Sequence, residues 1–129
     1  MKHVEPVEID PEFAVLPYED GWDATNLKFW RTVKLEAAAR CRKIRNASGL
    51  GSIAMLTGVG IAHHVEGVNF GTAGTLLVGI VTGTLAGSTL GHHKDAKFND
   101  VRAAENAQIV ANMFTRTGLT PPDWTVPSK

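Results

Sequence analysis

The distribution of charge constrains this chain more than any other feature of its sequence. Within residues 46–91 the only Asp, Glu, Lys or Arg is Glu66, although the chain has 13 basic and 13 acidic residues. Residues 46–65 and 67–91 are therefore two charge-free segments. As helices with a rise of about 1.5 Å per residue, each is about 30 Å long or more, which is the thickness of a bilayer's hydrocarbon core. We expect two transmembrane helices.

A soluble alternative has to be weighed against this interpretation, because the charge-free segments are rich in Gly, Ser, Thr and Ala. Such segments could form two buried glycine-rich helices or a glycine-rich β-array. The chain has 13 glycines, and each interior Gly weakens a soluble helix by about 1 kcal/mol. Glycine is more frequent in membrane helices, so the composition favours the bilayer.

The predicted fold is an all-α membrane protein of a single domain, a two-span transmembrane helical hairpin with amphipathic helical extensions and irregular termini. Asp23 is suited to cap the first helix, and Gly118 with the prolines after it ends the last. The apolar residues of the first segment indicate an arm that lies along a partner, with a disordered tail as the alternative. The predicted segments are 1–22 (extended acidic arm), 23–45 (basic amphipathic helix), 46–65 (transmembrane helix 1), 66–69 (turn), 70–91 (transmembrane helix 2), 92–117 (polar helix) and 118–129 (tail).

Small residues recur at every fourth position of the second span, a pattern that we call the glycine ladder. Its members are Gly67, Gly71, Thr75, Gly79, Gly83, Gly87 and Gly91, and Ala54, Gly58 and Ala62 form a shorter row in the first span. Without large side chains two backbones can approach closely, which favours association in lipid. We predict that these residues pack the two spans together. Docking of another protein's helix, or of lipid, is a compatible alternative.

Basic residues gather just before the first span. They are Arg40, Arg42, Lys43 and Arg45. A basic amphipathic helix that leads into a span is typical of a segment at the membrane surface, so these side chains are predicted to bind headgroups of an anionic phospholipid such as cardiolipin. The alternative is a solvated helix whose charges only flank the span.

The sequence shows no pattern typical of catalysis, and we expect a protein that is not an enzyme. A single Cys41 excludes an intramolecular disulfide and a multi-cysteine metal site. The pairs His63-His64 and His92-His93 are poor chelates, because neighbouring residues on a helix point about 100° apart, and the two pairs lie a membrane thickness apart. No catalytic residue, metal site, nucleic acid or small-molecule substrate is predicted.

Targeting signals are not recognisable at the N-terminus. The first 40 residues lack the apolar core of a secretory signal. Residues 1–23 contain seven acidic residues against Lys2, the opposite of a mitochondrial presequence. Import into an organelle would have to use an internal signal.

Several features between residues 29 and 105 together resemble one mitochondrial family. They are Phe29-Trp30, Cys41 with its basic neighbours, Gly49, Gly51-Ser52, the glycines of residues 58–60, Asn69 and the charged helix after His93. In these features the chain is similar to the two-span cytochrome c oxidase assembly factors that chaperone newly made oxidase subunit 2.

The resemblance implies a multi-pass protein of the mitochondrial inner membrane. Its function would be that of a non-catalytic accessory subunit or assembly factor of a respiratory complex, with cytochrome c oxidase as the first candidate. Its partners would be the membrane subunits of that complex and membrane lipids. The alternative is a self-associating glycine-zipper protein that shapes or scaffolds the membrane, as in the two-span cristae-organising proteins.

The orientation of the hairpin stays open at this stage. The family places both termini in the intermembrane space and a basic loop in the matrix, but residues 63–69 contain no Lys or Arg. The positive-inside rule puts both termini on the matrix or cytoplasmic side. The two arguments predict opposite topologies.

Overall fold

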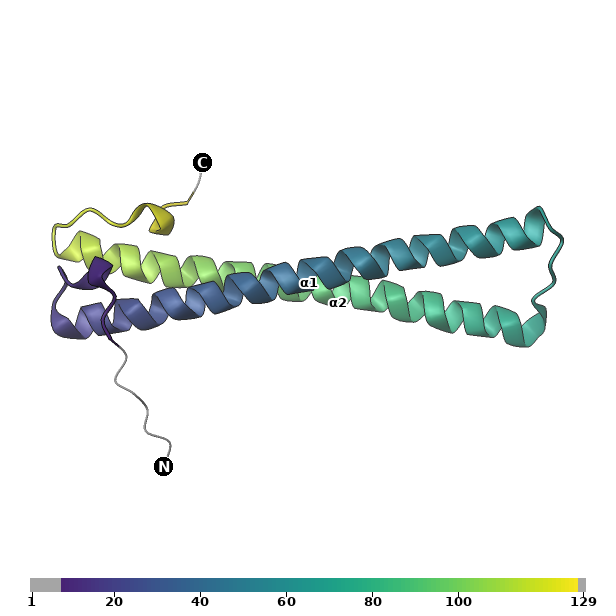
Figure 1. Ribbon diagram of the computed structural model, residues 1–129, viewed down its shortest axis with the longest axis horizontal. Coiled ribbons are helices and arrows are strands. Elements are labelled where there is room, and N and C mark those ends of the chain that lie inside the picture. Colours follow the sequence, from purple (N-terminus) through teal and green to yellow (C-terminus); the bar gives the residue numbers. More distant parts are fainter. Residues whose placement is uncertain (1–7, 128–129) are drawn as a thin grey trace, which may run out of the picture. The chain divides into compact units, whose positions relative to one another are not determined.

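The computed structural model describes residues 8–127, and all of their regular secondary structure is helical (Figure 1). A 3₁₀ helix, η1 (Pro11–Phe13), precedes the long helix α1 (Tyr18–His64). A short loop leads to the second long helix, α2 (Gly71–Arg116), and a 3₁₀ turn, η2 (Asp123–Thr125), follows it. The prediction of an all-α helical hairpin is confirmed, and the β-array alternative does not apply to the described residues.

The helix boundaries differ from those expected. The predicted helix over 23–45 and the predicted span over 46–65 are one continuous helix, as are the segments 70–91 and 92–117. Helix α1 begins at Tyr18 rather than at Asp23, because the Gly21 N–H already donates to the Pro17 carbonyl at 2.8 Å. Proline is favoured at a helix start, since its missing N–H would have no partner there. Asp23 therefore lies inside α1.

The expectation of an extended arm over residues 1–22 is wrong for the described part of it, and residues 1–7 lie outside the described residues. The Asp10 side chain accepts a hydrogen bond from the Glu12 N–H and caps η1, which starts at Pro11. Residues 18–22 are already helical. Local capping and proline chemistry thus turn this segment into a 3₁₀ helix followed by the first residues of α1.

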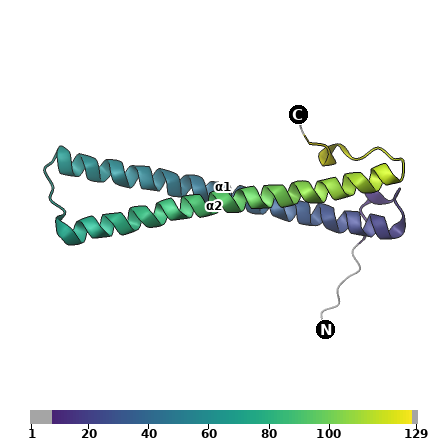
Figure 2. The same cartoon turned by 180° about the vertical axis from the view of Figure 1, so that it is seen from behind.

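The chain divides into two compact units, and each long helix contributes to both. The first unit contains residues 1–36 and 99–129, and the second contains residues 37–98. Figure 2 shows the same two helices from behind. Each unit has its own packing.

The core of the first unit joins the two ends of the chain. Phe13 is completely buried, and its ring meets those of Phe114 and Trp124 edge-on at centroid distances of 6.1 and 6.3 Å. The other buried members of the cluster are Leu16, Ala24, Val110 and Met113. The Trp124 Nε1–H also donates to Glu12 Oε1 at 3.0 Å. Ile9, Phe13 and Leu16 of the predicted arm thus pack on the chain's own helices, whereas Val15, Tyr18 and Trp22 are exposed. The predicted irregular tail contributes Trp124 to the same core.

A lysine links the N-terminal 3₁₀ helix to α1. Lys28 Nζ donates to Asp10 Oδ2 and to Glu12 Oε2, each at 2.8 Å, and lies 5.5 Å from the centroid of the Phe13 ring. The hydrogen bond from Lys28 lowers the pKa of Asp10, with help from the Glu12 N–H. In turn, the hydrogen bonds to Asp10 and Glu12 raise the pKa of Lys28.

These shifts predict that the first unit loses a little stability in acid. A carboxylate with a lowered folded pKa stabilises the fold above its unfolded pKa of about 4, and this contribution disappears as the pH falls through the folded value. The raised pKa of Lys28 gives a contribution that is complete below the unfolded lysine pKa and is lost only as the pH rises through the folded value. Because the Lys28 and Asp10 side chains are 37% and 30% exposed, the loss in acid is about 1 kcal/mol or less.

Thermal unfolding followed by tryptophan fluorescence between pH 2 and 7 tests this prediction. Lys28→Met should flatten the acid dependence, and Lys34→Met, a matched change on the same helix, should leave it as in the unmodified chain. If the melting temperature of Lys28→Met depended on pH as strongly as that of the unmodified chain, the Lys28–Asp10 pair would not contribute to stability.

Candidate functional site

The second unit aligns the two charge-free segments at one end. Arg45 Nη1 lies 3.2 Å from His93 Nδ1, and Ser48 Oγ lies 3.2 Å from Ser88 Oγ. Each pair joins the beginning of the first segment to the end of the second. The start of the first charge-free segment therefore lies beside the end of the second, at the same position along the hairpin axis.

Two glycines of α1 face α2 in this region. A Cβ atom added at Gly49 would lie 3.7 Å from Thr89 Cγ2, and one added at Gly51 would lie 3.6 Å from Leu85 Cδ1. These are ordinary van der Waals distances, so the helices approach closely enough for side chains of α2 to cover the bare backbone of α1. Gly49 and Gly51 lie near the shorter row that the sequence predicts to pack, but only the register of the two helices shows that they face α2.

The glycine ladder does not mediate the contact between α1 and α2. A Cβ atom added at Gly79, Gly83, Gly87 or Gly91 would meet no atom within 4 Å, and the same holds for Gly58 of the shorter row. Ala54 is exposed and Ala62 is half-buried. For Gly58, Gly79, Gly83, Gly87 and Gly91, the prediction that they pack the two helices of one chain together is therefore wrong.

The contact face of α2 explains why the ladder points elsewhere. Its half-buried residues are Val78, Val81, Thr82, Leu85, Ser88, Thr89 and His92. They recur at three- and four-residue steps, as expected for one face of a helix. A four-residue step advances about 40° around the helix, so the row from Gly79 to Gly91 follows a different face. The small residues are presented outward.

Large apolar side chains surround both helices of this unit. Eight of them are between 50% and 69% exposed: Leu50, Ile53, Leu56, Ile61, Leu76, Leu77, Ile80 and Leu90. So many exposed large apolar side chains on one pair of helices are rare on a soluble monomer and mark a surface that lipid or protein covers. Of the described helices, α2 is long and apolar enough to cross a membrane, and its apolar stretch is not buried within the structure. Helix α1 does not reach the same hydropathy.

The loop between the helices is short and closed by its own hydrogen bonds. Gly67 and Gly71 adopt positive φ angles of 68° and 64°, which explains why glycine occupies these two positions. The Asn69 side chain accepts from the Gly71 N–H at 3.0 Å, and the Val68 N–H donates to the Ala62 carbonyl at 2.9 Å. Gly67 and Gly71 therefore form the turn rather than a helix contact. The helices separate toward this loop (Figure 1).

The predicted headgroup-binding residues surround α1 instead of forming one pocket. At about 100° per residue, Arg40, Arg42, Lys43 and Arg45 point in different directions around the helix. Arg40 and Lys43 are exposed, whereas Arg42 and Arg45 are half-buried. Arg45 donates through Nε to Asn46 Oδ1 at 3.1 Å. The four residues thus form a basic ring next to the first charge-free segment.

The structure brings together a side-chain cluster that sequence reasoning missed. Donor atoms of Cys41, His92 and Asp95 all lie within 4.8 Å of one another. His92 and Asp95 are three residues apart and share one face of α2, a spacing that is visible in the sequence. Cys41 comes from α1, and only the register of the helices places it there. Viewed as the adjacent pair His92-His93, the histidines predict no metal site; His92 joins the cluster through Asp95, three residues later.

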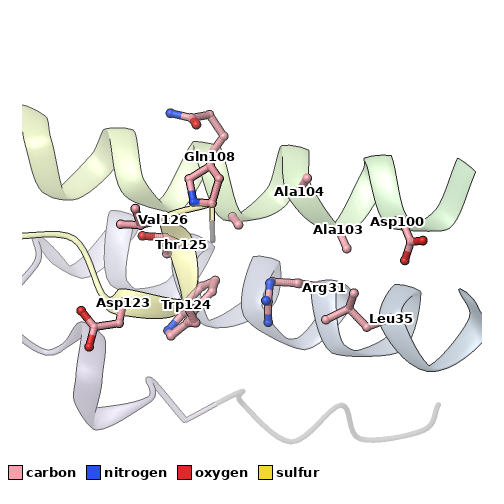
Figure 3. Close-up of a pocket in the computed structure, with 12 residues that line it drawn as sticks. Arg31, Leu35, Asp100, Ala103, Ala104, Gln108, Asp123, Trp124, Thr125 and Val126 are labelled. Atoms are coloured by element: carbon pink, nitrogen blue, oxygen red, sulfur yellow. The ribbon is translucent and has the colours of Figure 1, made fainter. Parts of the chain in front are cut away.

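The first unit contains a surface pocket of about 530 Å³ (Figure 3). Arg31 extends toward Trp124, with its guanidinium carbon 5.0 Å from the centroid of the ring. Alanines of α2 form much of the opposite wall, and Asp100 and Asp123 are the acidic lining residues. Stacking of Arg31 on the ring holds the C-terminal segment on the helices. We attribute the pocket to this packing of the C-terminal segment on the helices and do not treat it as a binding site.

Searches of family models, of curated proteins and of solved structures each found no match to this chain. The function therefore has to be inferred from the residues of the chain itself. The features that bear on it are the aligned charge-free segments, their apolar surface and the outward glycine ladder.

Proposed function

We propose that residues 46–91 form a two-span membrane hairpin and that the protein is a non-catalytic accessory subunit or assembly factor of a membrane complex. The contact between Arg45 and His93 is the observation that carries this proposal. It fixes the polar ends of both segments at one level, with the loop about 30 Å away along the helices. A bilayer would cover the exposed Leu and Ile side chains of both helices at once.

The outward glycine ladder supports a partner within the membrane. Lipid chains offer no hydrophobic drive for helix association, so close packing at small residues supplies much of the attraction between membrane helices. Gly79, Gly83 and Gly87 are exposed and have no contact with α1. The occupant that fits this face is a transmembrane helix of a larger membrane subunit.

The location that we propose is the mitochondrial inner membrane, with cytochrome c oxidase as the first candidate complex. The support is the resemblance carried by Phe29-Trp30, the glycines of the first span and the charged helix after His93. In this setting the basic ring would lie at headgroup level and hold an anionic phospholipid such as cardiolipin.

Affinity purification of the tagged chain in mild detergent tests the proposal. Respiratory membrane subunits should be recovered with the unmodified chain, and Gly79→Leu with Gly83→Leu should reduce their recovery about tenfold or more, equivalent to ~1.4 kcal/mol. Because a Cβ at either glycine meets nothing within 4 Å, the hairpin should keep its helicity. Thr84→Leu adds bulk beside the ladder and is the matched control. Recovery of the unmodified chain as a free monomer would contradict the proposal.

Self-association is the second candidate, and the same outward ladder favours it. Two copies could pack through Gly79 and Gly83 and form a scaffold without any foreign subunit. Chemical cross-linking in membranes separates the candidates. Homo-oligomers that disappear in the Gly79→Leu, Gly83→Leu variant, with no respiratory subunit recovered, would support the scaffold and exclude the accessory subunit.

A further inference from the structure

Three side chains of different donor chemistry converge beside the apolar hairpin. Cys41 of α1 and His92 of α2 are half-buried, Asp95 of α2 is exposed, and their donor atoms lie within 4.8 Å of one another. Thiolate, imidazole and carboxylate are the three groups that proteins use to bind Zn²⁺. A cluster that contains one of each therefore has the donor chemistry of a zinc site.

The distances fit zinc after a small adjustment. Zinc bonds to sulfur at about 2.3 Å and to nitrogen or oxygen at about 2.0–2.2 Å, so tetrahedral ligands lie about 3.5 Å apart. The three donor atoms would have to approach one another by about 1 Å.

A second observation at this cluster points to a missing ligand. His92 Nδ1 is buried and has no hydrogen-bond partner among the described residues. A buried polar atom without a partner costs about 1–3 kcal/mol, so such atoms call for an explanation. A metal ion bound at this Nδ1 atom would remove that cost.

The charge balance also favours a divalent cation. Zinc binding displaces the Cys41 thiol proton into solvent and forms a bond to the thiolate. One thiolate and one carboxylate neutralise the two charges of the ion. The zinc-bound centre is then neutral. It therefore adds no positive charge next to the basic ring that contains Arg40, Arg42 and Lys43.

We propose that Cys41, His92 and Asp95 bind a zinc ion that clasps α1 to α2 at the polar end of the hairpin. One ligand comes from α1 and two come from α2, so the ion bridges the two helices. The fourth coordination position is left for water. All three ligands lie outside residues 46–91, so the site does not depend on the location of the hairpin in a membrane.

The full chain, purified in detergent without a histidine tag, should bind one Zn²⁺ per molecule. Cobalt in place of zinc should give the charge-transfer absorption of a thiolate ligand, and Cys41→Ser should abolish that band. His92→Ala and Asp95→Asn should each weaken zinc binding about 100-fold or more, because loss of a mere outer-shell partner already costs 10–100-fold. Zinc should also raise the melting temperature of the unmodified chain but not that of Cys41→Ser.

His64→Ala is the matched control, since His64 is the last residue of α1, at the loop end of the hairpin and away from the cluster. It should leave zinc affinity and the cobalt band unchanged. The proposal would be overturned by a cobalt complex without a thiolate band, or by equal zinc affinity in the His92→Ala and unmodified chains. Circular dichroism of each variant separates loss of a ligand from loss of the fold.

Discussion

Replacing Phe13 with alanine is expected to unfold the unit made by residues 8–36 and 99–127 while the hairpin of residues 37–98 stays folded. Phe13 is completely buried and contacts the rings of Phe114 and Trp124. Truncation of a buried Phe costs about 3–5 kcal/mol, which is comparable with the whole stability of a small unit. The loss should therefore exceed what this unit can tolerate.

Hydrogen exchange of the full chain in detergent measures this effect region by region. In the Phe13→Ala variant, amides of residues 99–116 should exchange much faster and those of residues 48–60 should be unchanged. Val15→Ala is the control, because Val15 is 64% exposed and surface changes alter stability by about 0.5 kcal/mol or less. Unchanged exchange in both regions would show that Phe13 does not hold the unit together.

The second large effect is expected at the middle of the apolar segment of α2. Ile80→Arg places a charge at an exposed site, and a charged residue at the centre of a membrane helix costs about 2.5–3.5 kcal/mol on insertion scales. The fraction of chain that resists alkaline extraction from membranes should therefore fall sharply. If α2 instead lay in water, the added charge of Ile80→Arg would make the protein more soluble. The variant would then not lose a membrane-bound fraction.

A change elsewhere on α2 controls for effects of charge alone. Ile109→Arg also alters an exposed isoleucine, but it lies in the first unit, beyond the charge-free segment. Its alkaline extraction should match that of the unmodified chain. If Ile80→Arg and Ile109→Arg behaved alike, residues 71–91 would not lie in a bilayer.

Local sequence signals predicted the helices well and the chain ends poorly. The charge-free segments and the three- and four-residue spacing of apolar residues were sufficient for two helices and a hairpin. Residues 9–16 looked like an unsupported arm because their packing partners, Val110 and Phe114, lie far away in the sequence. A pattern within one segment contains no information about a partner so distant along the chain.

The glycine ladder shows a related limit. Its four-residue spacing correctly indicated that small residues share one face of a helix, but not which face meets α1. That choice depends on the register set by contacts such as Ser48 with Ser88. The same register places Cys41 beside His92. The cluster of Cys41, His92 and Asp95 therefore could not be predicted from the sequence alone.

The two-span hairpin itself is tested most directly by the sidedness of three positions in intact membranes. In a Cys41→Ser background, Val68→Cys provides a single thiol in the loop, and a tag at each terminus reports on the chain ends. Both tags should be cleaved by protease from the same side, and the loop thiol should react with an impermeant maleimide only from the other side. Tags on opposite sides, or a loop thiol on the same side as both tags, would contradict the account.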